Sequence, residues 1–195
     1  FLDRNGYLLA NPLCYRNSIG EEELSGLSDA DKRWVFEQTG IQNNRINSLY
    51  QLTGIKRIMP ELFEISQHLL MIPDLLGYFF TGEKFTEFSI ASTTQLLDVR
   101  SKEYSQAVID RFGLSQNMLK PLKKHGEVIG MLKDSIAEEL RIPACPVVCV
   151  PSHDTACAVT AVPTQEKDFL FISSGTWSLI GTELQEPIID KKVFE

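Results

Sequence analysis

Long hydrophobic runs are missing from this chain of 195 residues. A membrane-spanning helix needs about 20 consecutive apolar residues. The nearest candidate, residues 69–80, is interrupted by Pro73, Asp74 and Gly77. No secretory signal peptide is visible at the amino end. The sequence therefore predicts a cytoplasmic protein without a membrane partner.

Basic residues are also few. Lys and Arg number 19 against 26 Asp and Glu, which gives a formal net charge of −7. Binding to the phosphate backbone of a nucleic acid needs clustered Lys and Arg. The only local concentrations are residues 120–124 and the pair Lys191–Lys192. We therefore expect no nucleic-acid partner.

The cysteines lack the spacing of a metal or redox motif, since no pair is separated by two residues. Cys145 and Cys149 fall in an extended run, where four residues span about 13 Å, too far for one disulfide. We interpret all four cysteines as reduced, buried, small apolar side chains, and we expect no metal site in this chain.

Two common catalytic signatures are absent as well. No Gly-x-x-x-x-Gly-Lys run forms a phosphate-binding P-loop, and no Gly-x-Ser-x-Gly run forms the nucleophile elbow of a hydrolase. Ser152, His153 and Asp154 are adjacent in the chain. A hydrolytic triad converges from separated positions, so we reject that interpretation.

What is present is a globular composition, with 43% apolar and 23% charged residues. The length predicts one large domain or about one and a half. The chain opens without Met inside an apolar strand and ends without a terminal signal. We therefore expect it to be an internal piece of a longer protein.

The first three quarters of the chain are predicted to be mainly helical. Asn5–Gly6 predicts a hairpin turn, residues 13–27 are expected to be an exposed loop, and Gly54 is expected to interrupt a helix. Apolar spacing, caps and Pro positions predict helices at the following ranges: 29–38, 46–53, 60–70, 74–80, 104–112 and 132–140.

The last quarter has α/β character. The apolar run 145–150 is typical of a central strand buried on both faces. A turn at 151–154 and a helix over 155–162 follow it, and a polar link at 164–168 leads to a second hairpin. In that hairpin, 169–172 is predicted to be a buried strand and 177–181 the return strand. We place a domain boundary at the link, with one domain over 1–163 and the start of another over 164–195.

The first turn carries Ser152, His153 and Asp154 at the carboxyl end of a strand, where open α/β sheets bind ligands. The start of the following helix favours an ionised Asp154. Such a carboxylate can deprotonate a substrate hydroxyl in phosphoryl transfer. The alternative is an ordinary helix cap, with His153 merely packed nearby.

The second turn is Ser173–Ser174–Gly175–Thr176. Backbone N–H groups in a Gly-containing turn converge on one concavity and can bind phosphate oxygens, and Gly175 lets the backbone approach a ligand closely. The alternative is a plain hairpin turn, in which Ser, Gly and Thr are all expected.

Taken together, the two turns resemble those of the FGGY family of carbohydrate kinases. Further matching segments follow the family order along nearly the whole chain. The segments that carry the resemblance are Thr39–Gln42, Ile46–Leu52, Pro73–Leu76, Ala91–Leu97, Ser152–Ala156 and Ser173–Leu179.

This resemblance implies an incomplete actin-like (ribonuclease H-like) kinase fold, with ATP and sugar in a cleft between two domains. Residues 1–163 would be most of the sugar-binding domain, and 164–195 the first hairpin of the ATP-binding domain. Asp154 would be the general base, His153 would contact the sugar, and Gly175 with Thr176 would meet the nucleotide phosphates. The first phosphate loop and the adenosine-binding residues would lie outside this chain.

The expected reaction transfers the γ-phosphoryl group of ATP, with Mg²⁺, to a ketose, with L-rhamnulose preferred. L-fuculose, xylulose or another polyol remain alternatives, because specificity depends on pocket contacts. A non-catalytic sugar-binding or structural fragment is a further alternative. The expected partners are the sugar, ATP and the remainder of the kinase chain, and assembly into a homodimer is left open.

Overall fold

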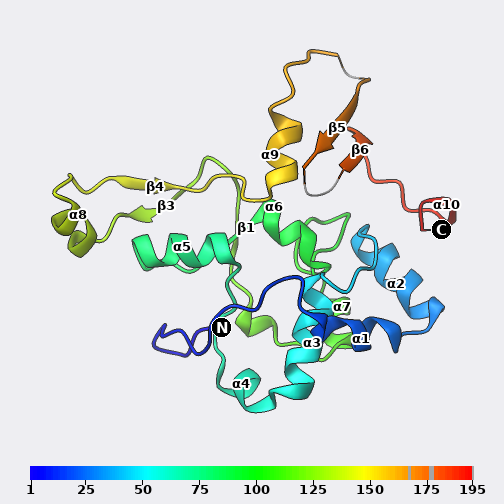
Figure 1. The fold of residues 1–195 in the computed structure, drawn as a ribbon, viewed down its shortest axis with the longest axis horizontal. Helices are drawn as coiled ribbons and strands as arrows, with labels where there is room; N and C mark the ends of the chain where they lie inside the picture. Colours follow the sequence, from blue (N-terminus) through cyan, green and yellow to red (C-terminus); the bar gives the residue numbers. More distant parts are fainter. Residues whose placement is uncertain (167, 176–177, 195) are drawn as a thin grey trace.

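The computed structural model describes residues 1–166, 168–175 and 178–194. Helices are the main secondary structure, and most of them pack together into one body. The strand pair of β3 (Val128–Met131) with β4 (Pro146–Val148) and the hairpin of β5 (Leu170–Ser174) with β6 (Ser178–Thr182) extend from this body (Figure 1). The helices are α1 (Glu21–Ser25), α2 (Asp29–Thr39), α3 (Ser48–Ile58), α4 (Pro60–Ile65), α5 (Ile72–Thr81), α6 (Phe88–Ala91), α7 (Gln106–Arg111), α8 (Asp134–Leu140), α9 (Asp154–Thr160) and α10 (Lys191–Phe194), with short 3-10 turns at Ser18–Gly20, Ser92–Thr94 and Gln116–Met118.

The strands form three separate pairs. They are β1 (Thr86–Glu87), β2 (Leu122–Lys123), β3 (Val128–Met131), β4 (Pro146–Val148), β5 (Leu170–Ser174) and β6 (Ser178–Thr182). β1 pairs with β2 in parallel, whereas β3–β4 and β5–β6 are antiparallel. The predicted amino-terminal turn is confirmed: Leu2 bridges Leu8, and Gly6 has a φ of +86°, which glycine tolerates.

The main core lies where α2, α3 and α7 meet. Its members are fully or almost fully buried apolar side chains: Val35, Leu49, Tyr50, Leu52, Leu96 and Val108. A smaller cluster joins Leu2 to Leu70 and Leu75, which anchors α5 to the amino-terminal segment. Burial of these side chains is the main source of stability, at roughly 25 cal/mol per Å² of apolar surface removed from water.

The helices predicted at 29–38 and 74–80 form as α2 and α5, although α5 begins two residues earlier than predicted and each helix ends one residue later. The Ser28 hydroxyl accepts the N–H of Asp31 at 3.1 Å and caps the start of α2. Gly40 and Gly82 end α2 and α5 in the left-handed conformation, with φ of +68° and +85°.

The prediction of a loop over 13–27 is wrong in its second half, because α1 forms there. Its acidic first turn faces basic side chains from α3 and the segment before it. Glu21 pairs with Arg45 at 2.7 Å, and Glu23 pairs with Arg57 at 2.6 Å. These partners lie more than 20 residues away in sequence, so local composition did not indicate them.

Gly54 does not interrupt α3. A Cβ at this position would lie 2.4 Å from the carbonyl oxygen of Ile19. The glycine therefore serves close packing of the Ser18–Gly20 turn on the helix, and α3 continues to Ile58.

The strand at 145–150 forms as β4, but the prediction that both faces are buried is wrong. β4 pairs only with β3 among the described strands, and Val148 and Val150 are 45% and 64% exposed. The same holds for β5, where Leu170 and Ile172 are exposed. An apolar run indicates strand formation, whereas burial requires a covering layer, and no described segment supplies one here.

The cysteines are free, but only Cys149 is buried. Cys14 and Cys145 are exposed, and Cys157 is half-buried. The prediction of four buried cysteines is therefore wrong for the exposed pair. Burial raises the pKa of the Cys149 thiol to about 11, and the nearby carboxyl groups of Glu87 and Asp74 add to the shift, so this side chain stays protonated at neutral pH.

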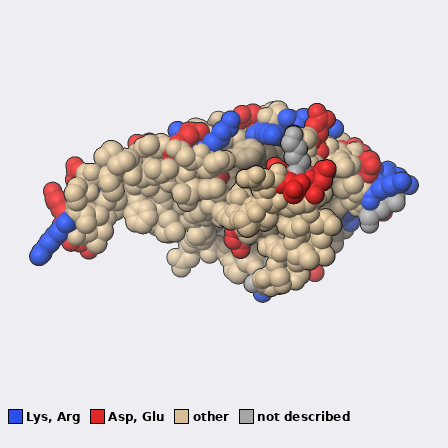
Figure 2. All heavy atoms as spheres, turned by 90° about the horizontal axis from the view of Figure 1, so that it is seen from above, with Lys and Arg blue, Asp and Glu red and all other residues tan. Residues whose placement is uncertain are grey.

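Charged groups of both signs share the surface. On the face drawn in Figure 2, basic and acidic side chains are interspersed along the upper rim and at both ends, and the area below the rim carries few charges. Within the described ranges, no helix has the length and apolar character needed to cross a membrane.

Candidate active site

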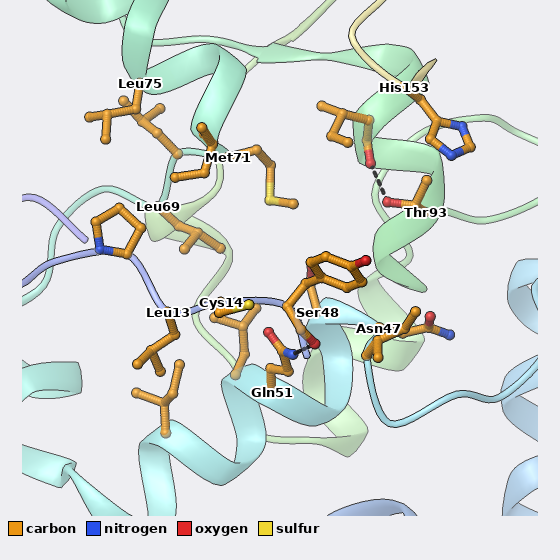
Figure 3. Close-up of a pocket in the computed structure, with 18 of the residues that line it drawn as sticks. Leu13, Cys14, Asn47, Ser48, Gln51, Leu69, Met71, Leu75, Thr93 and His153 are labelled. Atoms are coloured by element: carbon orange, nitrogen blue, oxygen red, sulfur yellow. Dashed lines mark hydrogen bonds between the residues drawn. The ribbon is translucent and has the colours of Figure 1, made fainter. Parts of the chain in front are cut away.

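One large cavity brings the two predicted turns together. Its volume is about 1210 Å³. Figure 3 shows His153 and Thr93 on one side and Leu69, Met71 and Leu75 on the other, with α3 residues below. His153, Asp154 and Gly175 line this cavity, and other polar residues along its wall are Tyr15, Asn47, Ser48, Gln51 and Ser173.

Asp154 and His153 stand at the start of α9. The Asp154 side chain is 98% exposed, and its Oδ1 accepts the N–H of Thr155 at 2.7 Å. The Nε2 atom of His153 lies 3.9 Å from the same Oδ1. His153 and Asp154 are therefore accessible from the cavity, and Asp154 has an unhindered carboxylate.

The second turn reaches the cavity through Ser173 and Gly175, at the carboxyl end of β5. A Cβ at Gly175 would meet no atom within 4 Å, so open space surrounds its backbone. α9 packs against β5, so the segments that carry the two turns are neighbours in the fold. Thr176 lies outside the described residues.

Ser152 points away from His153. Its hydroxyl donates to a carboxylate oxygen of Glu87 at 2.8 Å, and its N–H donates to the same oxygen at 3.2 Å and to the Ser89 hydroxyl at 3.0 Å. The N–H of His153 donates to the Ser89 hydroxyl at 3.1 Å. This arrangement agrees with the rejection of a Ser-His-Asp triad.

Sequence reasoning missed Glu87, which is only 2% exposed. Burial acts to raise the pKa of its carboxyl group, but hydrogen bonds from Ser89, Ser152 and Ile90 outweigh burial, and the pKa is lowered. The side chain is therefore an ionised hydrogen-bond acceptor beneath the first turn. The Glu87 side chain caps α6 by accepting the N–H groups of Ser89 and Ile90, but nothing in the local sequence points to Ser152.

A second buried carboxyl group, Asp74, lies behind Glu87. Its Oδ1 accepts the N–H of Glu87 at 2.9 Å, while its Oδ2 has no partner among the described residues. Burial raises the pKa of Asp74 to about 7 against the opposing effect of its backbone hydrogen bonds.

Hydrogen bonds between amide side chains stabilise the cavity wall at the start of α3. Asn47 Nδ2 donates to Gln95 Oε1 at 2.8 Å, and Gln95 Nε2 donates to the carbonyl of Ile41, also at 2.8 Å. Gln95 is fully buried and has a φ of 59°. The network fixes the amino end of α3, from which Ser48 and Gln51 face the cavity (Figure 3).

Known proteins match the chain in both sequence and fold. Residues 1–161 match the N-terminal domain of the FGGY family of carbohydrate kinases. The rhamnulokinase of Ligilactobacillus salivarius is 36% identical over 193 residues, covering 98% of this chain and 39% of that protein. The rhamnulokinase of Oceanobacillus iheyensis is 38% identical, covering 100% of this chain and 41% of that protein.

Solved structures agree on the fold. The ligand-bound xylulose kinase of Lactobacillus acidophilus superposes with a TM-score of 0.83 at 20% identity, covering 98% of this chain and 39% of that one. The glycerol kinase of Plasmodium falciparum with ADP gives a TM-score of 0.74 at 19% identity, covering 92% and 36%.

The chain spans about two fifths of the length of the curated relatives it matches. Its fold is accordingly part of the actin-like fold of sugar kinases. The agreement of the family match over most of the chain with this fold shows that the chain belongs to the FGGY family of carbohydrate kinases.

Proposed function

We propose that this chain is the sugar-binding part of an ATP-dependent kinase that phosphorylates L-rhamnulose to L-rhamnulose 1-phosphate. One observation carries the proposal: a single cavity is lined both by His153 and Asp154 and by Gly175 of the second turn. The rhamnulokinase relatives, at 34% to 38% identity, favour this substrate. On the same reasoning, residues 164–195 would begin the ATP-binding domain.

In this proposal Asp154 is the general base. Its exposed carboxylate takes the proton of the sugar hydroxyl as that oxygen bonds to the γ-phosphorus of ATP, and the bond from phosphorus to the ADP oxygen breaks. His153 contacts the sugar beside Asp154. Gly175 and Thr176 offer backbone N–H groups and a hydroxyl to the phosphates.

Mg²⁺ would enter with ATP as part of the substrate. The described parts of the chain hold no group of three or more His, Cys, Asp or Glu side chains that could bind a metal ion. Mg²⁺ commonly binds substrate phosphates plus one or two carboxylates and keeps several waters. In this proposal the nucleotide phosphates would hold most of the magnesium ion's coordination sphere.

The experiment is a kinase assay on the full-length protein that contains this chain. ADP release would be followed with MgATP and, in turn, L-rhamnulose, L-fuculose, xylulose, gluconate and glycerol. We expect ketose-dependent ADP release with the highest kcat/KM for L-rhamnulose. A higher kcat/KM for another sugar would reassign the substrate, and no release with any of them would contradict kinase function.

The alternative of a non-catalytic sugar-binding or structural fragment is tested by calorimetry on the 195-residue chain. Titration with ATP and, separately, with L-rhamnulose measures each affinity directly. Binding of ATP by this chain would count against the alternative, because a protein that only binds sugar needs no nucleotide contact.

A further inference from the structure

We propose that Glu87 is a positioning residue for the turn that carries His153 and Asp154. The inference rests on the proposed function, since it assigns Glu87 a part in the same reaction. Glu87 does not line the cavity, and it acts on the site through Ser152 and Ser89.

Most of the hydrogen bonds to Glu87 end on one of its two carboxylate oxygens. Oε2 of Glu87 accepts hydrogen bonds from the Ser152 N–H, the Ser152 hydroxyl, the Ser89 hydroxyl and the Ile90 N–H, at 2.5 to 3.2 Å. Oε1 accepts the Ser89 N–H at 2.8 Å. Both carboxylate oxygens face backbone N–H donors, so neither can carry a proton, and the five donors together require the ionised form.

Two of these five bonds join distant parts of the chain. Glu87 and Ser152 are 65 residues apart, and the Ser89 hydroxyl extends the link to the N–H of His153. Within the described parts of the chain, every hydrogen bond that the N–H groups of residues 152 and 153 donate therefore ends on Glu87 or on the Ser89 hydroxyl that Glu87 holds. The bonds within α6 would suffice for a helix cap, so those to Ser152 are additional.

The turn has little other support. His153 begins α9 without a side-chain cap bond, and among the described residues the polar partners of the Asp154 side chain are its neighbour Thr155 and, at 3.9 Å, His153. Burial of Glu87 strengthens its charge-assisted hydrogen bonds, because the local dielectric is low. The direction in which Asp154 projects into the cavity is thus set from below, by Glu87 through Ser152.

Four variants of the full-length protein test the role. Glu87→Gln keeps the side-chain size but places an amide N–H₂ against N–H donors in either orientation. Ser152→Ala removes only the hydroxyl donor and leaves the α6 cap whole. The third variant combines both changes. The control is Ser105→Ala, which removes the cap bond of a buried residue at the start of α7, away from the cavity.

We expect kcat for ketose phosphorylation to fall about tenfold or more in Glu87→Gln, because small misplacements of a catalytic group are costly. Ser152→Ala should lose several-fold, and the double variant should be no worse than Glu87→Gln alone. Ser105→Ala should keep its kcat. Effects that multiply in the double variant, or an equal loss of kcat in the control, would overturn the proposal.

Amide hydrogen exchange provides a readout that needs no activity. In Glu87→Gln the Ser152 and His153 amides should exchange at least tenfold faster than in the parent and in Ser105→Ala. The Ser152 N–H loses its carboxylate acceptor, and the Ser89 hydroxyl that accepts the His153 N–H loses the carboxylate oxygen that holds it. Equal exchange rates in all three proteins would overturn the positioning role. A parent without kinase activity would contradict the proposed function instead, and the exchange rates would still decide the role of Glu87.

Discussion

The Asp74 carboxyl group accepts the backbone N–H of Glu87 at 2.9 Å, so two buried acidic side chains lie next to each other. Their environments act in opposite directions. Burial raises the pKa of Asp74 to about 7, whereas the hydrogen bonds at Glu87 overcome burial and lower its pKa. Between pH 5 and 7, Asp74 therefore holds a proton in the folded protein while Glu87 is ionised.

The first prediction concerns stability against pH. The unfolded chain releases the Asp74 proton near pH 3.8, whereas the folded protein keeps it to about pH 7. The contribution of Asp74 is thus fully present below about pH 4 and is lost as the pH rises to 7. Glu87 has the opposite sign, because its pKa is lowered, and its contribution is already complete above about pH 5.

In the window from pH 5 to 7, stability should thus fall by up to about 1.4 kcal/mol per pH unit because of Asp74. Asp74→Asn imitates the protonated form and should flatten this slope. Urea unfolding at pH 5, 6 and 7 for both proteins measures it. An unchanged slope in Asp74→Asn would show that Asp74 is ionised throughout.

The second prediction concerns the proposed base. Asp154→Asn should lower kcat about 10²- to 10⁴-fold, the usual contribution of general-base catalysis, with little change in melting temperature because this side chain is exposed. Asp134→Asn is the matched control, since Asp134 also begins a seven-residue helix but does not line the cavity. Steady-state assays with L-rhamnulose and MgATP measure both, and full turnover by Asp154→Asn would refute the assignment.

The third prediction separates the two substrates. His153→Ala should raise the KM for the sugar about tenfold, the cost of roughly one hydrogen bond at 1.4 kcal/mol, and should change the KM for ATP much less. His125→Ala is the control, because His125 is exposed in a distant turn. A larger effect on the KM for ATP than on that for sugar would exclude the proposed role of His153.

The fourth prediction concerns packing. Gly54→Ala should destabilise the protein by about 1–3 kcal/mol through overpacking, although Ala favours a helix by about 1 kcal/mol over Gly. The reason is the 2.4 Å approach of a new Cβ to the carbonyl oxygen of Ile19. Thr53→Ala on the same helix should be close to neutral. Urea unfolding compares the two, and a more stable Gly54→Ala protein would mean that the Ser18–Gly20 turn can move away.

Sequence rules for helix caps predicted the structure correctly where the residues that form the cap are neighbours in sequence. Ser28 and Gly40 bound α2 as predicted, because a cap involves residues within one turn of the helix. The same rules missed α1, whose partners Arg45 and Arg57 lie on another segment. They also overestimated burial at Val148 and Val150, since a strand pattern does not reveal whether a second layer covers it.

The features of the candidate site also fall into those that the sequence predicts and those that depend on tertiary contacts. The sequence by itself determined the identities and the chain order of the two turns, and with them the family resemblance, because each turn is a contiguous motif. Only the tertiary structure decided that His153, Asp154 and Gly175 line one cavity, and that Glu87 supports the turn of His153 and Asp154 through Ser152, 65 residues away in sequence. Contacts across such distances depend on how the helices pack around the core, which no local pattern of residues specifies.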